Sequence, residues 1–211
     1  ITVSNNVWVT QNKIYNNTLG IGLFHPNGAG NPPLPVMANW VIEHNDVRNN
    51  NRANNAPAGS FQGQLPSGIG ILLAGVSDHV VAKNTVQGNG FVGIALLGWC
   101  TANAGTPNDC KAKPPVIDGV LYDPSVSNNL VSLNKVSGNG KNPPPLLPDS
   151  LLLLAADITY FEFEGSSGNC FDKNKPSNFT YVSSDGTLPT DGCKKPSRVR
   201  KTNELAVCGA P

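Results

Sequence analysis

The chain has little charge and no long apolar segment. Asp, Glu, Lys and Arg make up 14% of its 211 residues, against roughly 25% in an average protein. The formal net charge at pH 7 is only +1, which excludes the long-range attraction that nucleic acids and anionic membranes exert on strongly basic proteins. The apolar stretch "LLPDSLLLLAA" at 146–156 contains Asp149 and is too short to form a transmembrane segment.

The five cysteines lack the spacing of a metal or haem site. None forms a CxxC pair and no histidine stands near them at ligand spacing, so we expect no metal and no cofactor. Two short-range disulfides are plausible from the sequence, Cys100 with Cys110 and Cys170 with Cys193. Disulfides place the protein in an oxidising compartment, so we expect it to be secreted, periplasmic or on the cell surface. Cys208 is then a free thiol or pairs with a segment outside this sequence.

The common catalytic motifs are also absent. The sequence contains neither GxSxG nor HExxH, and "GIGILLAG" at 68–75 has glycines without the GxGxxG spacing of a nucleotide-binding loop. His25 and His79 stand apart from other ligand residues. We expect each of them to lie on the surface or in a loop.

What the sequence does contain is Asn and Gly at repeated positions. Each of four asparagines has valine or isoleucine three residues before it and again two residues after it. These anchors are Asn12, Asn45, Asn84 and Asn134. Branched residues at such offsets are typical of a stiff, half-buried strand surface.

Two more positions of the repeat are almost constant, and one is not. Five residues after each anchor stand Asn17, Asn50, Asn89 and Asn139. Six residues before each anchor stand Asn6, Asn39, Asp78 and Asn128. The position just before the anchor varies and holds Gln11, His44, Lys83 and Leu133. We expect the constant positions to face the interior and the variable positions to face solvent.

A second strand follows the anchor in the first three repeats. It is "GIGLF" at 20–24, "GIGIL" at 68–72 and "GIALL" at 93–97. Side chains alternate along a strand, which predicts three inward pairs: Ile21 and Leu23, Ile69 and Ile71, Ile94 and Leu96.

The outward positions of this second strand form a flat apolar face. They are Gly22, Phe24, Gly70, Leu72, Ala95 and Leu97. Contiguous apolar surface normally has a partner. Either the chain's own loops or its C-terminal segment cover this face, or a partner protein or extended ligand binds there.

The intervals between anchors are unequal because Gly-, Pro- and Asn-rich segments interrupt the repeat. Without those segments one repeat has about two dozen residues, a length found in solenoids. We therefore predict an all-β fold, a right-handed parallel β-helix with long loop insertions. Apolar columns would form a continuous core, and inward asparagines would hydrogen-bond from coil to coil.

The repeat pattern Φ-x-x-N-x-Φ-x-[NG]-N, followed by G-I-x-[LI], resembles that of pectate-lyase-like proteins over residues 1 to about 142. More narrowly, "NNLVSLNKVSGNGKN" with "GNCFDKN" resembles exported bacterial proteins with tandem β-helix repeats, whose function is unassigned. Some of these are encoded beside an exported protein of cytochrome type, which the resemblance implies as one partner. A fold of this kind says little about chemistry.

Both ends of the sequence depart from the repeat. "ITVSNN" at the start aligns with the second strand, so we expect an incomplete first coil, with further coils upstream or a partner chain at this edge. We expect the coils to occupy residues 1–164, where "DSLLLLAADITYFEF" supplies a last strand. Residues 165–211 are expected to form a cap and tail stapled by cysteines.

Charged and aromatic residues are expected on the outer face of the anchor strands. β-Helix enzymes that resemble this fold act on polyuronates from such a face, which makes Tyr15, His44 and Arg48 candidates for a base and a carboxylate clamp. Lys13 and Asp46 are predicted to share a column, but ion pairs of that kind occur on any solvated sheet. No catalytic motif of those enzyme families is matched residue by residue.

Two classes of function remain open. The first is an exported scaffold or binding module for a partner protein or a glycan. The second is a polysaccharide-active enzyme, namely a polyuronate lyase, epimerase or hydrolase. The missing catalytic residues and the flat apolar face favour the first class.

Overall fold

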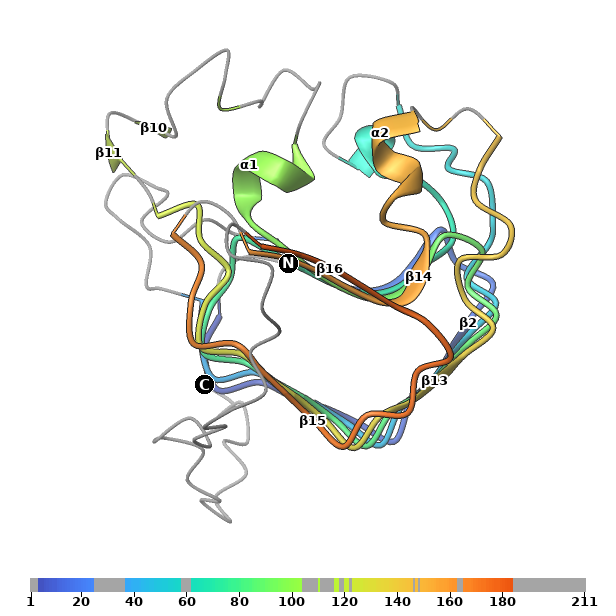
Figure 1. Ribbon diagram of the computed structural model, residues 1–211, viewed down its shortest axis with the longest axis horizontal. Coiled ribbons are helices and arrows are strands. Elements are labelled where there is room, and N and C mark those ends of the chain that lie inside the picture. The colour runs from blue at the N-terminus through green and yellow to red at the C-terminus, as the bar shows by residue number, and fades with distance from the viewer. Residues whose placement is uncertain are drawn as a thin grey trace, which may run out of the picture.

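Three parallel sheets of short stacked strands form the body of the molecule (Figure 1). In the computed structural model the described residues are 4–24, 37–57, 62–103, 110, 116–117, 120–121, 123–145, 147, 149–162 and 165–183. The chain adds a strand to each of the three sheets in turn as it passes through each of the first four repeats. This arrangement is consistent with a parallel β-helix-like solenoid.

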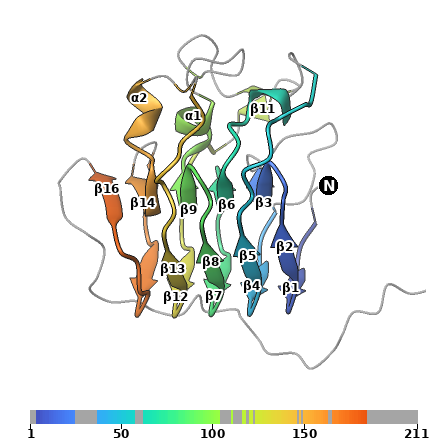
Figure 2. The same cartoon turned by 90° about the vertical axis from the view of Figure 1, so that its right-hand side faces the viewer.

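The strands of each sheet lie side by side in the order of the repeats (Figure 2). The first sheet contains β1 (Trp8–Thr10), β4 (Val41–Glu43), β7 (Val80–Ala82), β12 (Leu130–Ser132) and β15 (Cys170–Asp172). The second contains β2 (Lys13–Tyr15), β5 (Asp46–Arg48), β8 (Thr85–Gln87) and β13 (Lys135–Ser137). The third contains β3 (Leu19–Phe24), β6 (Ile69–Ala74), β9 (Val92–Leu97), β14 (Ala156–Glu162) and β16 (Phe179–Ser183).

The remaining elements lie in the insertions between these strands. They are η1 (Gln62–Gln64), α1 (Trp99–Ala102), α2 (Asp149–Leu152) and an antiparallel pair, β10 (Val116–Ile117) with β11 (Val120–Leu121). Among the described residues, no helix has both the length and the hydropathy that crossing a membrane requires.

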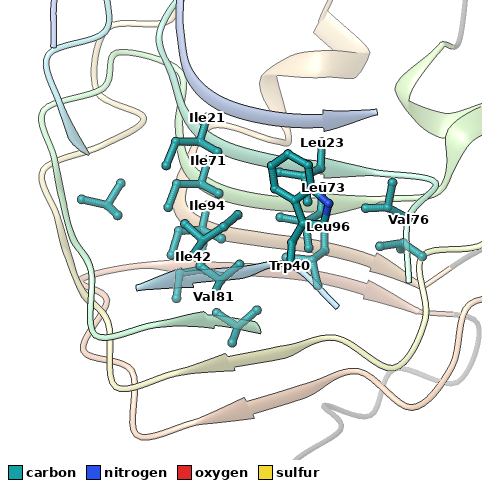
Figure 3. Close-up of a cluster of buried hydrophobic side chains, with 14 of the residues drawn as sticks. Ile21, Leu23, Trp40, Ile42, Ile71, Leu73, Val76, Val81, Ile94 and Leu96 are labelled. Carbon is teal, nitrogen blue, oxygen red and sulfur yellow. The ribbon is translucent and has the colours of Figure 1, made fainter. Parts of the chain in front are cut away.

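The branched residues that flank the anchors form the core. In the first sheet the register aligns Val9, Ile42, Val81 and Val131, and in the second it aligns Ile14, Val47, Val86 and Val136. From the second repeat onward each of these side chains is fully buried. Burying one of them contributes roughly 1.5–3 kcal/mol. Residues of the third sheet, such as Ile71 and Leu73, face them across the interior (Figure 3).

The predicted asparagine ladder is present at the corner between the first two sheets. The backbone N–H and side-chain Nδ2 of Asn45 both donate to Asn84 Oδ1, at 3.0 Å each. Asn84 donates to Asn134 in the same way, at 2.9 and 3.0 Å, and Asn12 donates to Asn45. The ladder also runs one step further than predicted, because Asn134 donates to Asn174 Oδ1.

A second ladder occupies the corner between the second and third sheets. It connects Asn17, Asn50, Asn89 and Asn139. Its next member is Asp157, whose Oδ1 accepts from both nitrogens of Asn139 at 2.8 Å and whose Oδ2 accepts from the backbone of Ser177. The backbone N–H of Asp157 in turn donates to Asn178 Oδ1 at 2.7 Å. Asp157 is almost fully buried. Its carboxylate therefore takes the place of an amide carbonyl as the acceptor.

The column six residues before the anchors does not face the interior, contrary to the prediction. Asn6 and Asn128 are exposed, and Asn39 and Asp78 are only partly buried. All four have a positive φ of 56–65°. Asn and Asp tolerate this left-handed backbone better than other residues with a side chain, so this column is constant because of its corner geometry.

The variable position before each anchor also has a left-handed backbone conformation, at a corner of the coil. Gln11, His44, Lys83 and Leu133 have φ values of 56–59° and are exposed, as predicted. Because a bulky apolar residue is unfavourable in this conformation, Leu133→Asn is expected to raise the free energy of unfolding by about 1 kcal/mol. Urea denaturation of both proteins measures the difference.

Leu153→Asn provides the control for that prediction. Leu153 is 64% exposed and is not among the residues with positive φ. The same change of side chain should then leave stability within about 0.5 kcal/mol of the wild type. Equal effects at positions 133 and 153 would show that hydropathy, and not backbone conformation, causes the gain.

The register of the third sheet differs from the prediction in the second repeat. Ile71 aligns with Ile21 and Ile94, and Leu73 aligns with Leu23 and Leu96. Ile69 instead belongs to an outer cluster, and Gly70 is not an outward position. Gly70 and Ile71 both face the interior, so the alternation that the prediction assumed begins only at Ile71.

Gly70 occupies a place that has no room for a side chain. A Cβ there would press on the carbonyl oxygen of Gly93 and lie 2.8 Å from Val86 Cγ1 and from Asn89 Nδ2. We expect Gly70→Ala to destabilise the protein by about 2–3 kcal/mol. At Gly22 a Cβ meets the Phe24 ring and the Leu19 methyl. Those side-chain ends can move, so Gly22→Ala should cost less than about 1 kcal/mol in the same thermal or urea unfolding assay.

The stack of strands continues beyond residue 164. β15 pairs with β12 in the first sheet, and β16 pairs with β14 in the third. Residues 165–183, which the sequence analysis assigns to the cap, therefore extend the sheets, and Asn174 supplies the further anchor. β14 is the last-coil strand expected from "DSLLLLAADITYFEF".

Candidate functional site

The outer face of the third sheet is covered by the chain's own insertions. α1 and α2 lie on this side of the sheet (Figure 1). Of the predicted partner-binding residues, Leu72 is 4% exposed, Ala95 1% and Leu97 5%. They pack in an apolar cluster with Phe91 and Leu154, the latter from the segment that follows α2. Of the alternatives left open by the sequence, the structure therefore supports cover by the chain's own loops.

Local interactions hold α1 in place beside this face. Its first residue, Trp99, is buried and its backbone N–H donates to Pro124 O at 2.7 Å. The predicted disulfide between Cys100 and Cys110 is present, with 5.2 Å between the two Cα atoms. Asn103 Nδ2 donates to Trp99 O at 2.8 Å and closes the helix at its C-terminus. The other predicted disulfide involves Cys193, which lies outside the described residues, as does Cys208.

The second helix reaches the same face from a different insertion. Leu151 and Leu154 pack into the apolar cluster, and Leu154 O accepts from Thr159 Oγ1 on β14 at 2.8 Å. Leu152 and Leu153 point away from the cluster and are 41% and 64% exposed. The four consecutive leucines therefore divide between the sheet and the outer surface.

A cavity of about 50 Å³ lies between the sheet and these insertions. Its lining residues are Phe24, Leu65, Pro66, Ile69, Leu72, Ala74, Phe91, Val92, Ala95, Leu97, Thr101, Ala102, Asn103, Leu151 and Leu154. None of these residues is ionisable. The cavity can accommodate an apolar group, and its lining residues within the described ranges provide no acid or base for catalysis.

Four of the six predicted partner-binding residues line this cavity, namely Phe24, Leu72, Ala95 and Leu97. Gly22 and Gly70 do not. The residues contributed by α1, α2 and the segment after η1 could not be placed from the sequence, because nothing in the repeat indicates where an insertion folds. Ile69 was assigned to the interior and lies instead in the cavity wall, because the alternation of faces is broken at Gly70 and Ile71.

The predicted polar surface is assembled on the outer face of the first two sheets. Lys13 aligns with Asp46 and Tyr15 with Arg48, in the register that the sequence predicts. Arg48 donates to Asp46 through Nε, at 2.7 Å from Oδ1, and through Nη2. These hydrogen bonds, and then the carboxylate charge, raise the pKa of Arg48 above its ordinary value. The guanidinium is thus already paired with a carboxylate.

The remaining candidate, His44, stands at the corner between β4 and β5. His44 Nδ1 is 3.5 Å from Glu43 Oε2, and Trp8 Nε1 donates to Glu43 Oε1 at 3.0 Å. Trp8 and Tyr15 are 53% and 56% exposed. Across the part of the chain that the structure describes, no group of three His, Cys, Asp or Glu residues could hold a metal ion. The surface therefore offers exposed aromatic rings and paired charges.

His79 is buried in the interior, and not on the surface or in a loop as predicted. It stands at the corner before the first sheet, where the following repeats have Asn129 and Asn169. Its Nδ1 accepts from the backbone N–H of Trp40 at 3.1 Å, and its own backbone N–H donates to Asn129 Oδ1 at 3.0 Å. Nε2 is buried without a hydrogen-bond partner. Loss of hydration on burial lowers the pKa of His79 to about 3.

Comparison with known proteins gave no match to a family model, a curated protein or a solved structure. The functional argument therefore depends on the two surfaces described above.

Proposed function

We propose that this chain is a right-handed parallel β-helix of an exported protein, and that it acts as a rigid binding scaffold for a partner protein. The partner would dock where α1 and α2 cover the third sheet. The ladders and the stacked core support the rigidity, since each coil is held to the next by backbone and amide hydrogen bonds. The Cys100–Cys110 disulfide supports an oxidising compartment.

One observation carries the choice of docking surface. Leu152 and Leu153 are exposed, while Leu151 and Leu154 on either side of them line the cavity. Adjacent exposed leucines over an apolar cavity form the kind of patch that protein partners cover. Few large apolar side chains are exposed among the described residues, and these two lie together.

The test is the native mass of the protein purified from its source, with mass spectrometry of every co-purifying chain. We expect a stable complex that is lost in the double variant Leu152→Glu/Leu153→Glu. The control is Trp8→Ala/Tyr15→Ala, which removes the exposed aromatic rings of the other surface and should leave the complex intact. A wild-type monomer, or a complex that survives the leucine variant, contradicts the proposal.

A second candidate is a polysaccharide-active enzyme that acts from the surface around Tyr15, His44 and Arg48. It is favoured by the exposure of Trp8 on β1 and Tyr15 on β2, which follow one another in the chain but belong to different sheets, because exposed aromatic rings can stack on sugars. The pairing of Arg48 with Asp46 weighs against a free carboxylate clamp. Turnover of soluble polyuronates that is abolished in Tyr15→Phe would favour this candidate over the scaffold.

A further inference from the structure

Several outward side chains of the first sheet are more deeply buried than their position on an outer face would suggest. The outward residues form two columns, Trp8, Val41, Val80, Leu130 and Cys170 in one, and Thr10, Glu43, Ala82, Ser132 and Asp172 in the other. Val80 is only 8% exposed, and Ala82 and Ser132 are buried as well. The outward residues of the second sheet, by contrast, are exposed or only partly buried, as at Thr85 and Gln87 of the same coil.

The described segments do not account for this burial. Neither Val80 nor Ala82 belongs to the two apolar clusters that the described residues form. α1 and α2 lie over the third sheet and not over the first (Figure 1). The burial therefore points to cover by a segment of the chain outside the described residues.

Cys170 indicates which segment reaches this face. It stands in an outward column on β15, the edge strand of the first sheet, yet it is only 5% exposed and its sulfur is in a disulfide. Cys100 and Cys110 are bonded to each other. The partner of Cys170 within the chain is therefore Cys193 or Cys208, both of which follow β16 and lie outside the described residues.

The C-terminal segment, residues 184–211, is long enough to reach this face and to cross it. In an earlier coil the chain passes from the third sheet to the first between Ala74 and Val80. The stretch from Ser183 to Cys193 is longer than that. Crossing from β15 to β1 spans four strand spacings of about 4.8 Å, which takes roughly six extended residues. The part of the segment that follows Cys193 exceeds this length.

The charge and the hydropathy of the C-terminal segment complement the face. The stretch "CKKPSRVRK" at 193–201 contains five basic residues and no acidic one. The only charged residues among the outward positions of the first sheet are Glu43 and Asp172, which are both acidic. The segment also contains the apolar stretch "LAV" at 205–207, which can cover the branched column around Val80.

We propose that the C-terminal segment lies across the outer face of the first sheet as a strap, and that a disulfide between Cys170 and Cys193 holds it there. Cys193 is nearer in the chain than Cys208, so its loop closes at the lower entropic cost. A dithiol releases the strap. It gives two electrons and two protons to the bond, which leaves Cys170 and Cys193 as thiols and converts the dithiol into its own disulfide.

Release of the strap exposes the apolar column that contains Val80. This face is distinct from the one that α1 and α2 cover, so the inference does not depend on the proposed function. It makes the accessible surface of the first sheet dependent on the redox state of one cysteine pair.

The test follows methyl NMR signals of the full chain in the presence of a soluble nitroxide, which broadens the signals of exposed methyl groups. In the oxidised protein we expect Val80 to be broadened little more than Val86, which is fully buried in the core. Dithiothreitol, or the variant Cys193→Ser, should increase the broadening of Val80 several-fold and leave Val86 protected. The control variant Cys100→Ser/Cys110→Ser lacks the other disulfide and should keep Val80 protected until dithiothreitol is added.

Peptide mapping of the unreduced protein identifies the bond itself. A fragment that joins Cys170 to Cys208 overturns the assigned pair, and strong broadening of Val80 in the oxidised protein overturns the strap. Continued protection of Val80 after reduction would mean that a different insertion covers the face, and overturns the proposal as well. If Cys193→Ser does not fold, reduction of Cys100→Ser/Cys110→Ser gives the same measurement, because the bond of Cys170 is the only disulfide left within that chain.

Discussion

Replacing Asn84 with alanine is expected to lower the free energy of unfolding by about 3–5 kcal/mol. Asn84 is 1% exposed and takes part in hydrogen bonds on both sides of its coil. Its Oδ1 accepts from the backbone and side chain of Asn45, and its Nδ2 donates to Asn134 Oδ1 and to Ile42 O. Alanine leaves the Asn45 backbone N–H and the Ile42 carbonyl without partners in an interior that water does not reach.

The neighbouring residue provides a matched control. Lys83 precedes Asn84 in the chain but is exposed, and alanine can keep its left-handed backbone about as well as lysine. Lys83→Ala should therefore change stability by less than about 0.5 kcal/mol. Urea denaturation monitored by circular dichroism gives both values. Similar losses for the two variants would mean that the ladder does not stabilise the stack.

Acid is expected to destabilise the protein through His79, with a slope of about 1.4 kcal/mol per pH unit. In the folded state the pKa of His79 is about 3, because burial removes the hydration of the charged imidazolium, whereas its ordinary value is 6.5. Between these two values the unfolded chain binds a proton that the folded protein excludes. Stability is therefore complete above pH 6.5 and falls progressively as the pH drops towards 3.

His79→Asn isolates this contribution. Asparagine at this corner matches Asn129 and Asn169 in the next two coils and does not titrate. At pH 4 the wild type should have lost about 3 kcal/mol more than His79→Asn, relative to each protein at pH 7. His44→Asn is the control, because His44 is exposed and has the same left-handed backbone as the other corner residues. Parallel pH profiles for wild type and His79→Asn would contradict the prediction.

The parts of the fold that the sequence predicts are those with repeated chemistry. Branched residues equivalent to Val81 and Val86 flank the asparagine equivalent to Asn84 in the first four repeats, and the structure places each in its expected column. The alignment of Tyr15 with Arg48 follows from the same offsets. Because the coils stack in register, residues at the same offset in successive repeats lie next to one another in space. A recurring residue can therefore be placed without knowing the structure of the loops.

Other features could not be predicted because the repeat is ambiguous or broken there. The segment around Gly70 contains Gly-Ile twice, and the structure aligns Ile71, not Ile69, with Ile21 and Ile94. The corner that holds His79 contains Val7, Trp40 and Asn129 in other repeats, so no single residue type marks it. Around Asn174 the expected branched residues are replaced by Phe171 and Pro176, which conceals the last coil.

Predicting the cavity would have required information that the repeat does not contain. Phe24, Leu72, Ala95 and Leu97 were recognised as an outward apolar face from alternation alone. The insertions that cover this face could not be recognised, because their residues Leu151, Ala102 and Leu65 belong to three segments with no common pattern. The position of an insertion is set by side-chain packing after the strands have stacked, and that packing differs in each repeat.

The distance along the chain between stacked strands has a consequence for how the protein folds. Each step of the ladder joins residues that are 33, 39, 50 or 40 positions apart, and the described strands of the three main sheets pair only with strands of other coils. A closed loop of that length must form before the first hydrogen bond between two coils compensates for its entropy. Once two coils have paired, each further coil pairs with the edge strands that are already formed. The slow step in folding is then the meeting of the first two coils. Asp157 and Asn178, on the coils of β14 and β16, are only 21 positions apart, so the C-terminal pair has the shortest loop to close.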